Sequence, residues 1–317
     1  MLAVRLEKGR VQLRNVARPR RPDGFAVIRL LYGGICNTDL ELQRGYYGFS
    51  GIPGHEFVGE VVEAESREWI GQRVVGEINL ACGKCEWCGR GLGRHCPNRT
   101  VLGIVKHPGA FREFLTLPQR NLRRVPGQIS TEQAVFVEPL AAACEILEQV
   151  RIPANAAIAV LGDGKLGLLI SQVLKAHEHE VHLYGHHKEK LAIADAAGIE
   201  TRSRQKPPRS EYDFVVDATG SSAGLRQAVE MTRPRGTVIM KSTVHGLLRI
   251  DTAPLIVNEI SLIGSRCGCF EPAIDLLRKG KVRVDNLISE IVLLSQAPLG
   301  FKLAKASRTL KVLLRNQ

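Results

Sequence analysis

A glycine-rich turn directly after a strongly apolar run constrains the fold of this chain more than any other sequence feature. Residues 156–161 (AAIAVL) are apolar without interruption, which is typical of a parallel strand buried on both faces. Gly162, Gly164 and Gly167 follow in the pattern GxGxxG, and helical spacing then continues over residues 166–176. Strand, glycine turn and helix in this order predict a βαβ unit that binds a dinucleotide.

Each element of the turn has a physical use in such a unit. Gly162 permits the tight turn, Gly164 lets the backbone approach a pyrophosphate, and Gly167 lets the helix pack closely on the strand. The helix begins near Lys165 and Leu166, where free amide groups and a positive partial charge favour phosphate. The alternative is an ordinary glycine-rich turn that binds nothing.

The alternation of strands and helices continues downstream. We expect further strands at residues 181–184, 212–217, 236–240 and 260–264, and helices at 188–197 and 223–231. We expect a loop at residues 201–210, because the paired prolines Pro207 and Pro208 exclude the interior of a helix. This pattern predicts an α/β fold with a doubly wound parallel sheet. Later, residues 272–278 and 299–306 are expected to be helical.

The first 140 residues have a different texture. Short β-like runs, such as residues 24–31, 57–62 and 114–117, are separated by glycine and proline, which indicates an antiparallel and partly barrel-like domain. A length of 317 residues also favours two domains over one.

Four cysteines lie close together in the first half of the chain. They are Cys82, Cys85, Cys88 and Cys96, and two-residue gaps let successive thiolates surround one ion. Four sulfur ligands close a tetrahedral zinc shell, so this zinc would be structural rather than catalytic. An iron–sulfur cluster and a set of buried or redox-active cysteines are the alternatives.

Composition and charge limit the partners and the location that the chain can have. The formal net charge is +12, but the basic residues are scattered without a long block of like charge, so we expect no nucleic-acid partner. No apolar run is long enough to span a membrane, and the N-terminal residues carry charges without a signal-peptide core. The expected location is the cytoplasm.

The end of the second strand of the βαβ unit indicates which cofactor binds. A site for NAD places an acid there, about 20 residues after the glycines, to bind the ribose 2′-hydroxyl. This chain instead has His186, His187 and Lys188, whose positive charges would attract a 2′-phosphate. The sequence therefore favours NADP, with solvated histidines and acceptance of NAD as the alternative. Thr219, after a later strand, is a further candidate contact.

A third group of candidate residues is dispersed along the chain. A thiol, an imidazole and carboxylates are the donors of a catalytic zinc site with an exchangeable position. Such donors occur in three segments: Cys36 with Thr38 and Asp39, His55 with Glu56, and Glu138. Spacing alone does not assemble them, and each residue could equally well be packed in a core.

Taken together and in this order, the three groups resemble the zinc-dependent medium-chain alcohol dehydrogenases. Glu138-Pro139-Leu140, in place of a cysteine, is similar to the polyol, threonine and glucose dehydrogenase branches. The resemblance implies a GroES-like catalytic domain, residues 1–145 and 267–317, with a zinc lobe at 80–98. It implies a Rossmann dinucleotide-binding domain at 146–266.

The resemblance also implies residue roles. Cys36 and His55 would bind the catalytic zinc, and Glu56 and Glu138 would bind it directly or through water. Asp39 would orient a ligand, and Thr38 would accept the proton of the substrate hydroxyl. The implied reaction transfers a hydride between an alcohol, polyol or sugar hydroxyl and NADP. The resemblance implies two zinc ions per chain. It also implies a homodimer or a homotetramer.

The chain also departs from its relatives. Glu41 stands where many of them have a relay histidine, so the route of the proton beyond Thr38 is open. Tyr46, Tyr47 and Phe49 could form the floor of a substrate pocket or merely pack, and Glu113 could bind a sugar hydroxyl or be an exposed strand residue. An NAD-linked dehydrogenase of small secondary alcohols or threonine is the alternative enzyme. A zinc-stabilised module that binds nucleic acid or protein is the alternative class.

Overall fold

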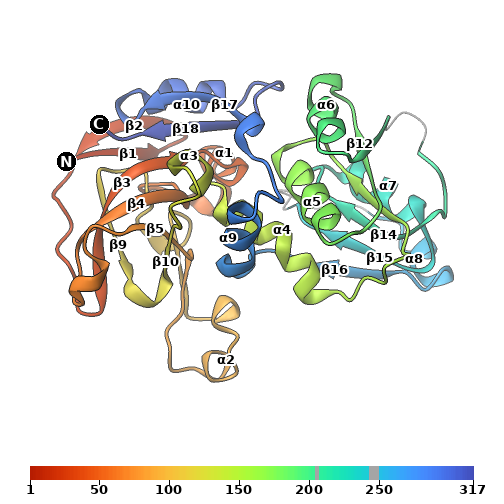
Figure 1. Cartoon of the computed structure of the whole chain (residues 1–317), viewed down its shortest axis with the longest axis horizontal. Helices are drawn as coiled ribbons and strands as arrows, with labels where there is room; N and C mark the ends of the chain where they lie inside the picture. Colours follow the sequence, from red (N-terminus) through yellow and green to blue (C-terminus); the bar gives the residue numbers. More distant parts are fainter. Residues whose placement is uncertain (204–206, 243–249) are drawn as a thin grey trace. The chain divides into compact units, whose positions relative to one another are not determined.

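The computed structural model describes residues 1–203, 207–242 and 250–317, which form two compact units. The first unit comprises Met1–Glu138 and Leu287–Gln317, and the second comprises Pro139–Asn286. In Figure 1 the first unit is coloured red to yellow and, for its C-terminal part, dark blue, and the second runs from the yellow-green of α4 to the blue of α9.

A seven-stranded sheet organises the first unit. Its central strand, β3 (Phe25–Gly34), pairs antiparallel with β4 (Glu56–Glu63), β9 (Phe114–Pro118) and β18 (Lys311–Arg315). The apolar residues of β3 are buried on both faces, since Ala26, Val27, Ile28 and Leu30 have no exposed surface. The sheet is completed by β5 (Arg73–Gly76), β10 (Leu122–Arg124) and β17 (Ile288–Leu293).

Shorter elements surround this sheet. They comprise a hairpin of β1 (Leu2–Glu7) and β2 (Arg10–Asn15), a small sheet of β6 (Asn79–Leu80), β7 (Thr100–Leu102) and β8 (Lys106–His107), and the helices α1 (Asn37–Gln43), α2 (Glu86–Gly89), α3 (Thr131–Ala134) and α10 (Ala297–Leu303). The 3₁₀ turn η1 (Tyr46–Gly48) follows α1.

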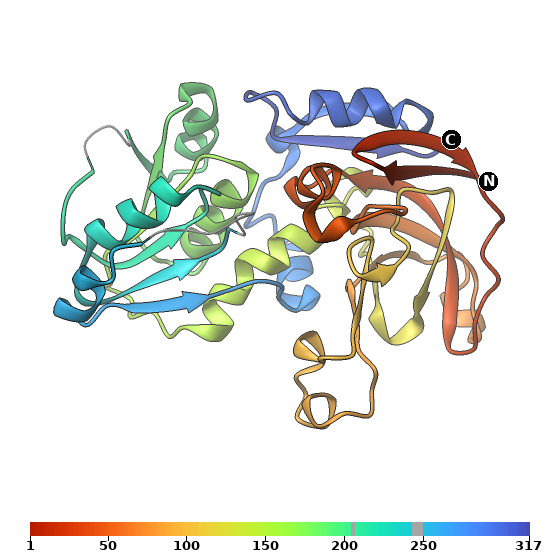
Figure 2. The ribbon, with the colours of Figure 1, turned by 180° about the vertical axis from the view of Figure 1, so that it is seen from behind.

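A six-stranded parallel sheet organises the second unit, in the order β13-β12-β11-β14-β15-β16. Figures 1 and 2 show α5 and α6 on one face of this sheet and α7 on the other. The strands are β11 (Ile158–Leu161), β12 (Val181–Gly185), β13 (Glu200–Ser203), β14 (Tyr212–Asp217), β15 (Thr232–Met240) and β16 (Ser261–Gly264). The helices are α4 (Val137–Gln149), which starts in the first unit, α5 (Lys165–Ala176), α6 (Lys188–Ala196), α7 (Ser222–Met231), α8 (Ala253–Val257) and α9 (Phe270–Arg278).

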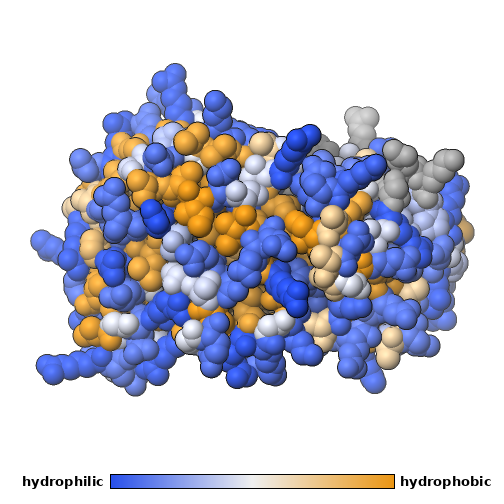
Figure 3. Space-filling view, turned by 45° about the horizontal axis from the view of Figure 1, so that its top comes forward, coloured by the Kyte–Doolittle hydropathy of each residue, from blue (hydrophilic) through white to orange (hydrophobic). Residues whose placement is uncertain are grey.

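This strand order is that of the dinucleotide-binding doubly wound fold. The predicted fold class is therefore confirmed, with a mainly β unit beside a parallel α/β unit. The face of the molecule in Figure 3 is mainly hydrophilic, with hydrophobic patches between the polar side chains. Within the described residues, no helix is both long and apolar enough to cross a bilayer.

The structure differs from the sequence-based expectations in three places. Residues 200–203 form the edge strand β13, paired with β12, where a loop was expected, and residues 204–206 lie outside the described part of the chain. The strand β18 was not foreseen. Residues 139–145 and 267–286 belong to the second unit, because α4 is continuous and Gly268 packs directly against its Ala141 carbonyl.

Candidate active site and metal centres

The paired strands β3 and β4 bring three of the dispersed residues together. Gly34, the last residue of β3, lies opposite Glu56, the first residue of β4. Cys36 follows β3 as the N-cap residue of α1, and His55 directly precedes β4. A ligand atom of each of Cys36, His55 and Glu56 therefore lies within 4.8 Å of the others.

Asp39 ties these segments together. Its carboxylate accepts hydrogen bonds from the backbone N–H of Cys36 (2.9 Å) and of Gly54 (3.1 Å), and one of its oxygens lies 3.6 Å from His55 Nδ1. Asp39 has no exposed surface, so its negative charge is confined to this cluster. These contacts fit the expectation that Asp39 orients a ligand.

The protonation of His55 reflects this setting. Burial is the largest effect and lowers its pKa, but the carboxylate of Asp39 and the thiolate of Cys36 together raise the pKa well above its ordinary value. A cation bound here would compete with that proton, so binding should release a proton.

Lys311 is a member of the cluster that the sequence did not reveal. Its ammonium group contacts Glu56 Oε2, although the two residues are 255 positions apart, and both side chains are fully buried. Gly34 permits this approach, because a Cβ there would lie 2.8 Å from Glu56 Oε2. A lysine within the apolar run of residues 310–314 was the available signal.

The donor set fits a divalent cation. His55 Nδ1 and Glu56 Oε1 are both buried without a hydrogen-bond partner in the described structure, and buried polar atoms seldom stay unpartnered. Thr38 lies at the edge of the cluster, with Oγ1 3.8 Å from Cys36 Sγ. Thiol, imidazole and carboxylate are the ligands of catalytic zinc sites.

Glu138 is not in this three-residue group. It is half-buried in the first turn of α4 and is the last residue of the first unit. Its role as a fourth ligand stays a prediction.

The second metal centre is the lobe that contains α2, which Figure 1 shows projecting from the sheet of its unit. Ligand atoms of Cys82, Cys85, Cys88 and Cys96 lie within 4.8 Å of one another. The sulfur of Cys85 lies 3.5 Å from that of Cys88 and 3.6 Å from that of Cys96. Sulfurs about 2.3 Å from one tetrahedral zinc would lie about 3.8 Å apart.

The thiols of the lobe differ in acidity, since the pKa of Cys85 is raised to about 11: the backbone N–H of Cys88 lowers it, but burial and the neighbouring sulfurs outweigh that effect. The backbone N–H of Lys84 is the main cause that lowers the pKa of Cys82, to about 6. The sulfur separations are far too long for disulfides, which need about 2.05 Å. The lobe therefore fits one closed four-sulfur zinc site.

The glycine turn of the second unit has the predicted geometry. Gly162 has φ 113°, in the region that favours glycine, and a Cβ on Gly167 would lie 1.9 Å from the Gly162 carbonyl oxygen. Nothing lies within 4 Å of a Cβ built on Gly164, which leaves the N-terminus of α5 open. Lys165 and Leu166 form the first turn of α5, next to that opening.

Some of the other residues expected to contact the cofactor already bind carboxylates of the protein. His186 and Lys188 are exposed, whereas His187 is the N-cap residue of α6 and its Nδ1 lies 3.1 Å from both carboxylate oxygens of Asp163. The Thr219 hydroxyl donates to Asp217 at 2.7 Å. Asp163, between the first two glycines, is a residue that the sequence analysis did not single out.

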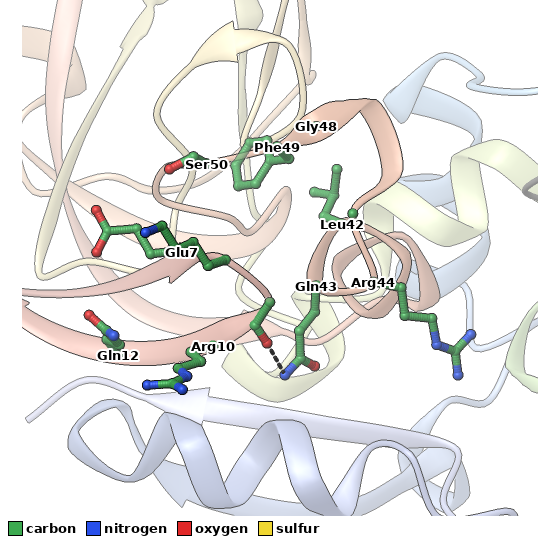
Figure 4. Close-up of a pocket in the computed structure, with 12 residues that line it drawn as sticks. Glu7, Arg10, Gln12, Leu42, Gln43, Arg44, Gly48, Phe49 and Ser50 are labelled. Carbon is green, nitrogen blue, oxygen red and sulfur yellow. Dashed lines mark hydrogen bonds between the residues drawn. The ribbon is translucent and has the colours of Figure 1, made fainter.

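Two hollows lie outside the three-residue cluster. One of about 1170 Å³ lies between the β1–β2 turn and the C-terminal end of α1, where Gln43 donates to the Gly9 carbonyl (Figure 4). It shares no residue with the cluster, which lies at the other end of α1. The second hollow, of about 380 Å³, is lined by His186, by Pro207 and by residues of α7 that include Arg226.

Comparisons with known proteins agree with this geometry. Residues 22–127 match the alcohol dehydrogenase GroES-like domain, and residues 166–279 match the zinc-binding dehydrogenase family. D-altritol 5-dehydrogenase of Agrobacterium fabrum is 32% identical over 282 residues, 82% of each chain. The chain therefore belongs to the zinc-dependent medium-chain alcohol and polyol dehydrogenase family. It is an oxidoreductase that acts on CH–OH donors.

Solved structures share the fold over nearly the whole chain. An alcohol dehydrogenase of Escherichia coli CFT073, solved with NADH, superposes with a TM-score of 0.91 over 99% of both chains at 24% identity. A zinc-binding dehydrogenase of Sinorhizobium meliloti 1021, solved with NADP, superposes with a TM-score of 0.90 over 99% of this chain and 98% of that one, at 26% identity. The two neighbours carry different cofactors.

We predict that Cys88→Ser removes one of two zinc ions per chain, because three thiolates and a hydroxyl do not close the shell. Metal analysis of the purified variant measures this. Cys269→Ser changes a half-buried cysteine of the other unit and should keep both ions. A Cys88→Ser protein with an unchanged zinc content would contradict the four-sulfur site.

We predict that Lys311→Met destabilises the metal-free protein by about 3–5 kcal/mol, because Glu56 is left charged and buried. Adding Glu56→Gln should restore most of the loss. Urea unfolding in the presence of a chelator gives both values. Arg29→Met, which breaks a partly exposed pair with Glu60 between β3 and β4, should cost at most about 1 kcal/mol. Strictly additive losses for Lys311 and Glu56 would show that the two are not coupled.

Proposed function

We propose that this chain is a zinc-dependent dehydrogenase of polyols or sugars that uses NAD or NADP. The observation that carries the proposal is the cluster of Cys36, His55 and Glu56, in which His55 Nδ1 and Glu56 Oε1 are buried without a hydrogen-bond partner among the described residues, with the Thr38 hydroxyl at its edge. The D-altritol dehydrogenase relative supports a polyhydroxylated substrate. A dehydrogenase of small secondary alcohols is the alternative.

The residues of the cluster have separable tasks. Cys36, His55 and Glu56, with Glu138, would hold the metal, and zinc bound there supplies Lewis acidity that lowers the pKa of a substrate hydroxyl. Thr38 would relay the proton of that hydroxyl, accepting it while its own hydroxyl proton passes to the nicotinamide ribose. Asp39 fixes the backbone of both ligand segments, and Lys311 holds one oxygen of Glu56.

The candidate substrate-binding residues differ in how many contacts they already make within the protein. Glu113 accepts a hydrogen bond from the Leu2 backbone at 2.6 Å, so it anchors β1. The rings of Tyr46 and Tyr47 lie 4.1 Å apart, and the hydrogen bond between their hydroxyls raises the pKa of Tyr46 to about 12. Tyr47 is largely exposed, so its ring is accessible from solvent.

The choice between NADP and NAD is a separate question from the class of reaction. The expectation of NADP rests on His186, His187 and Lys188 and on the absence of an acid at the end of β12. The structural neighbours include one with NADH and one with NADP, so they favour neither cofactor for this chain.

We also propose a homodimer or homotetramer. The strand β16 is the edge of the parallel sheet, and an open edge strand favours pairing with a second copy. Exposed apolar side chains lie near it: Ile256 (74% exposed), Val257 (79%) and Leu262 (38%).

We predict that Thr38→Ala lowers kcat on the best polyol by about 10²–10⁴-fold, because the proton acceptor is lost. Thr38→Ser should keep most of the activity. The assay measures NADH and NADPH formation over a panel of polyols, sugars and secondary alcohols, together with zinc content. Full activity of Thr38→Ala with both zinc ions present would refute the assigned role. A wild-type protein that is inactive on the whole panel while it holds both zinc ions would refute the function.

We predict that Leu262→Glu converts the oligomer to a smaller species, because a charge would be buried at the paired edge. Light scattering at micromolar concentration measures the mass. Leu299→Glu, at an exposed leucine of the other unit, should leave the mass unchanged. A monomeric wild-type protein would contradict the proposed assembly.

A further inference from the structure

Asp163 lies where an NAD-binding site would place its acid. Such sites carry the acid at the end of the second strand, about 20 residues after the glycines. In this chain the strand end is the junction of Gly185, the last residue of β12, and His186, which follows it, and neither is an acid. A Cβ built on Gly185 would lie 2.6 Å from the Asp163 Cβ and 2.6 Å from its Oδ2. The carboxylate of Asp163 therefore occupies the space that a side chain at position 185 would enter.

The same carboxylate also uses the donors that a phosphate would need. Asp163 Oδ2 accepts hydrogen bonds from the backbone N–H of His186 at 2.6 Å and of His187 at 2.7 Å. These amides lie at the start of α6, where free N–H groups and the helix dipole favour an anion. Asp163 is thus an internal anion, already bound where a 2′-phosphate would seek amide donors.

The charge balance around Asp163 points the same way. Burial alone would raise the pKa of Asp163, but the hydrogen bonds from His187 and His186 hold it below its ordinary value, so Asp163 is ionised at neutral pH. Its side chain is only 9% exposed, which leaves its charge poorly screened. The imidazole of His187 is engaged by the same carboxylate, and His186 and Lys188 are exposed to solvent.

We propose that Asp163 is the residue that selects the cofactor, and that it makes the chain bind NAD in preference to NADP. This replaces the preference for NADP that the sequence suggests, and it rests on the nucleotide binding included in the proposed function. Asp163 would accept a hydrogen bond from the ribose 2′-hydroxyl and repel a 2′-phosphate. The acid is supplied by the glycine turn instead of the strand end.

Direct binding of nucleotide fragments tests this without turnover, zinc or a known substrate. Calorimetry of the wild-type protein should show that 5′-AMP binds at least about tenfold more tightly than 2′,5′-ADP. NADH should likewise bind more tightly than NADPH. Binding of 2′,5′-ADP tenfold more tightly than AMP by the wild-type protein would overturn the proposal. Because no reaction is measured, an inactive enzyme would still give this result.

The variant Asp163→Asn keeps the shape of the side chain and removes its charge. We expect it to reduce the preference for AMP by at least about tenfold, mainly by strengthening 2′,5′-ADP binding. As a control, Asp195→Asn removes the same charge from an exposed carboxylate on α6, which accepts a hydrogen bond from Thr201. It should leave the ratio of AMP to 2′,5′-ADP affinity unchanged. An unchanged ratio in a folded Asp163→Asn protein, checked by circular dichroism, would overturn the proposal. If that variant does not fold, the wild-type ratio alone decides.

Discussion

The antiparallel register of β3 and β4 is the constraint on which the candidate metal site depends. Gly34 faces Glu56 across this ladder, so the residues just beyond one strand meet the residues at the start of the other. A slip of one residue would turn every side chain of β4 to the opposite face of the sheet and separate the donors. Asp39 secures the junction, because its carboxylate binds the backbone of Cys36 on one side and of Gly54 on the other. The ligands are thus positioned by the sheet, and the short helix α1 only carries the clamp.

The buried contact of Lys311 with Glu56 has a physical cost that stability alone does not justify. Removing two charges from water is unfavourable, and apolar residues of similar size often serve a core equally well. The pair is understandable if Glu56 must remain charged while only one of its oxygens is neutralised. Its other oxygen, Oε1, has no hydrogen-bond partner among the described residues, and a carboxylate oxygen of Glu56 lies within 4.8 Å of ligand atoms of Cys36 and His55. Lys311 then holds a carboxylate ready for a cation without competing for all of it.

The sequence revealed the features that local pattern encodes, and it missed those that depend on distant contacts. The glycine turn, the apolar strands and the spacing of the four cysteines are each contained within a few residues, so the parallel unit and the lobe could be predicted. Lys311 could not be placed, since its partner lies 255 positions away and the strand that carries it was not foreseen. The edge strand β13 was missed for a related reason: its pairing with β12 outweighs a local sequence rich in arginine and followed by proline.

Asp163 shows why the choice of cofactor is especially hard to infer from position alone. A motif assigns the ribose-binding acid to the end of the second strand, but the ribose responds to where a carboxylate lies, not to which strand carries it. Gly185 leaves room at that point, and the neighbouring turn fills it with a carboxylate fixed by two amides and an imidazole. The imidazole of His187 already contacts this anion of the protein itself, whereas His186 contributes only its backbone N–H and its imidazole is exposed. The start of α6 therefore binds a carboxylate of the protein through the backbone N–H groups of His186 and His187 and the imidazole of His187.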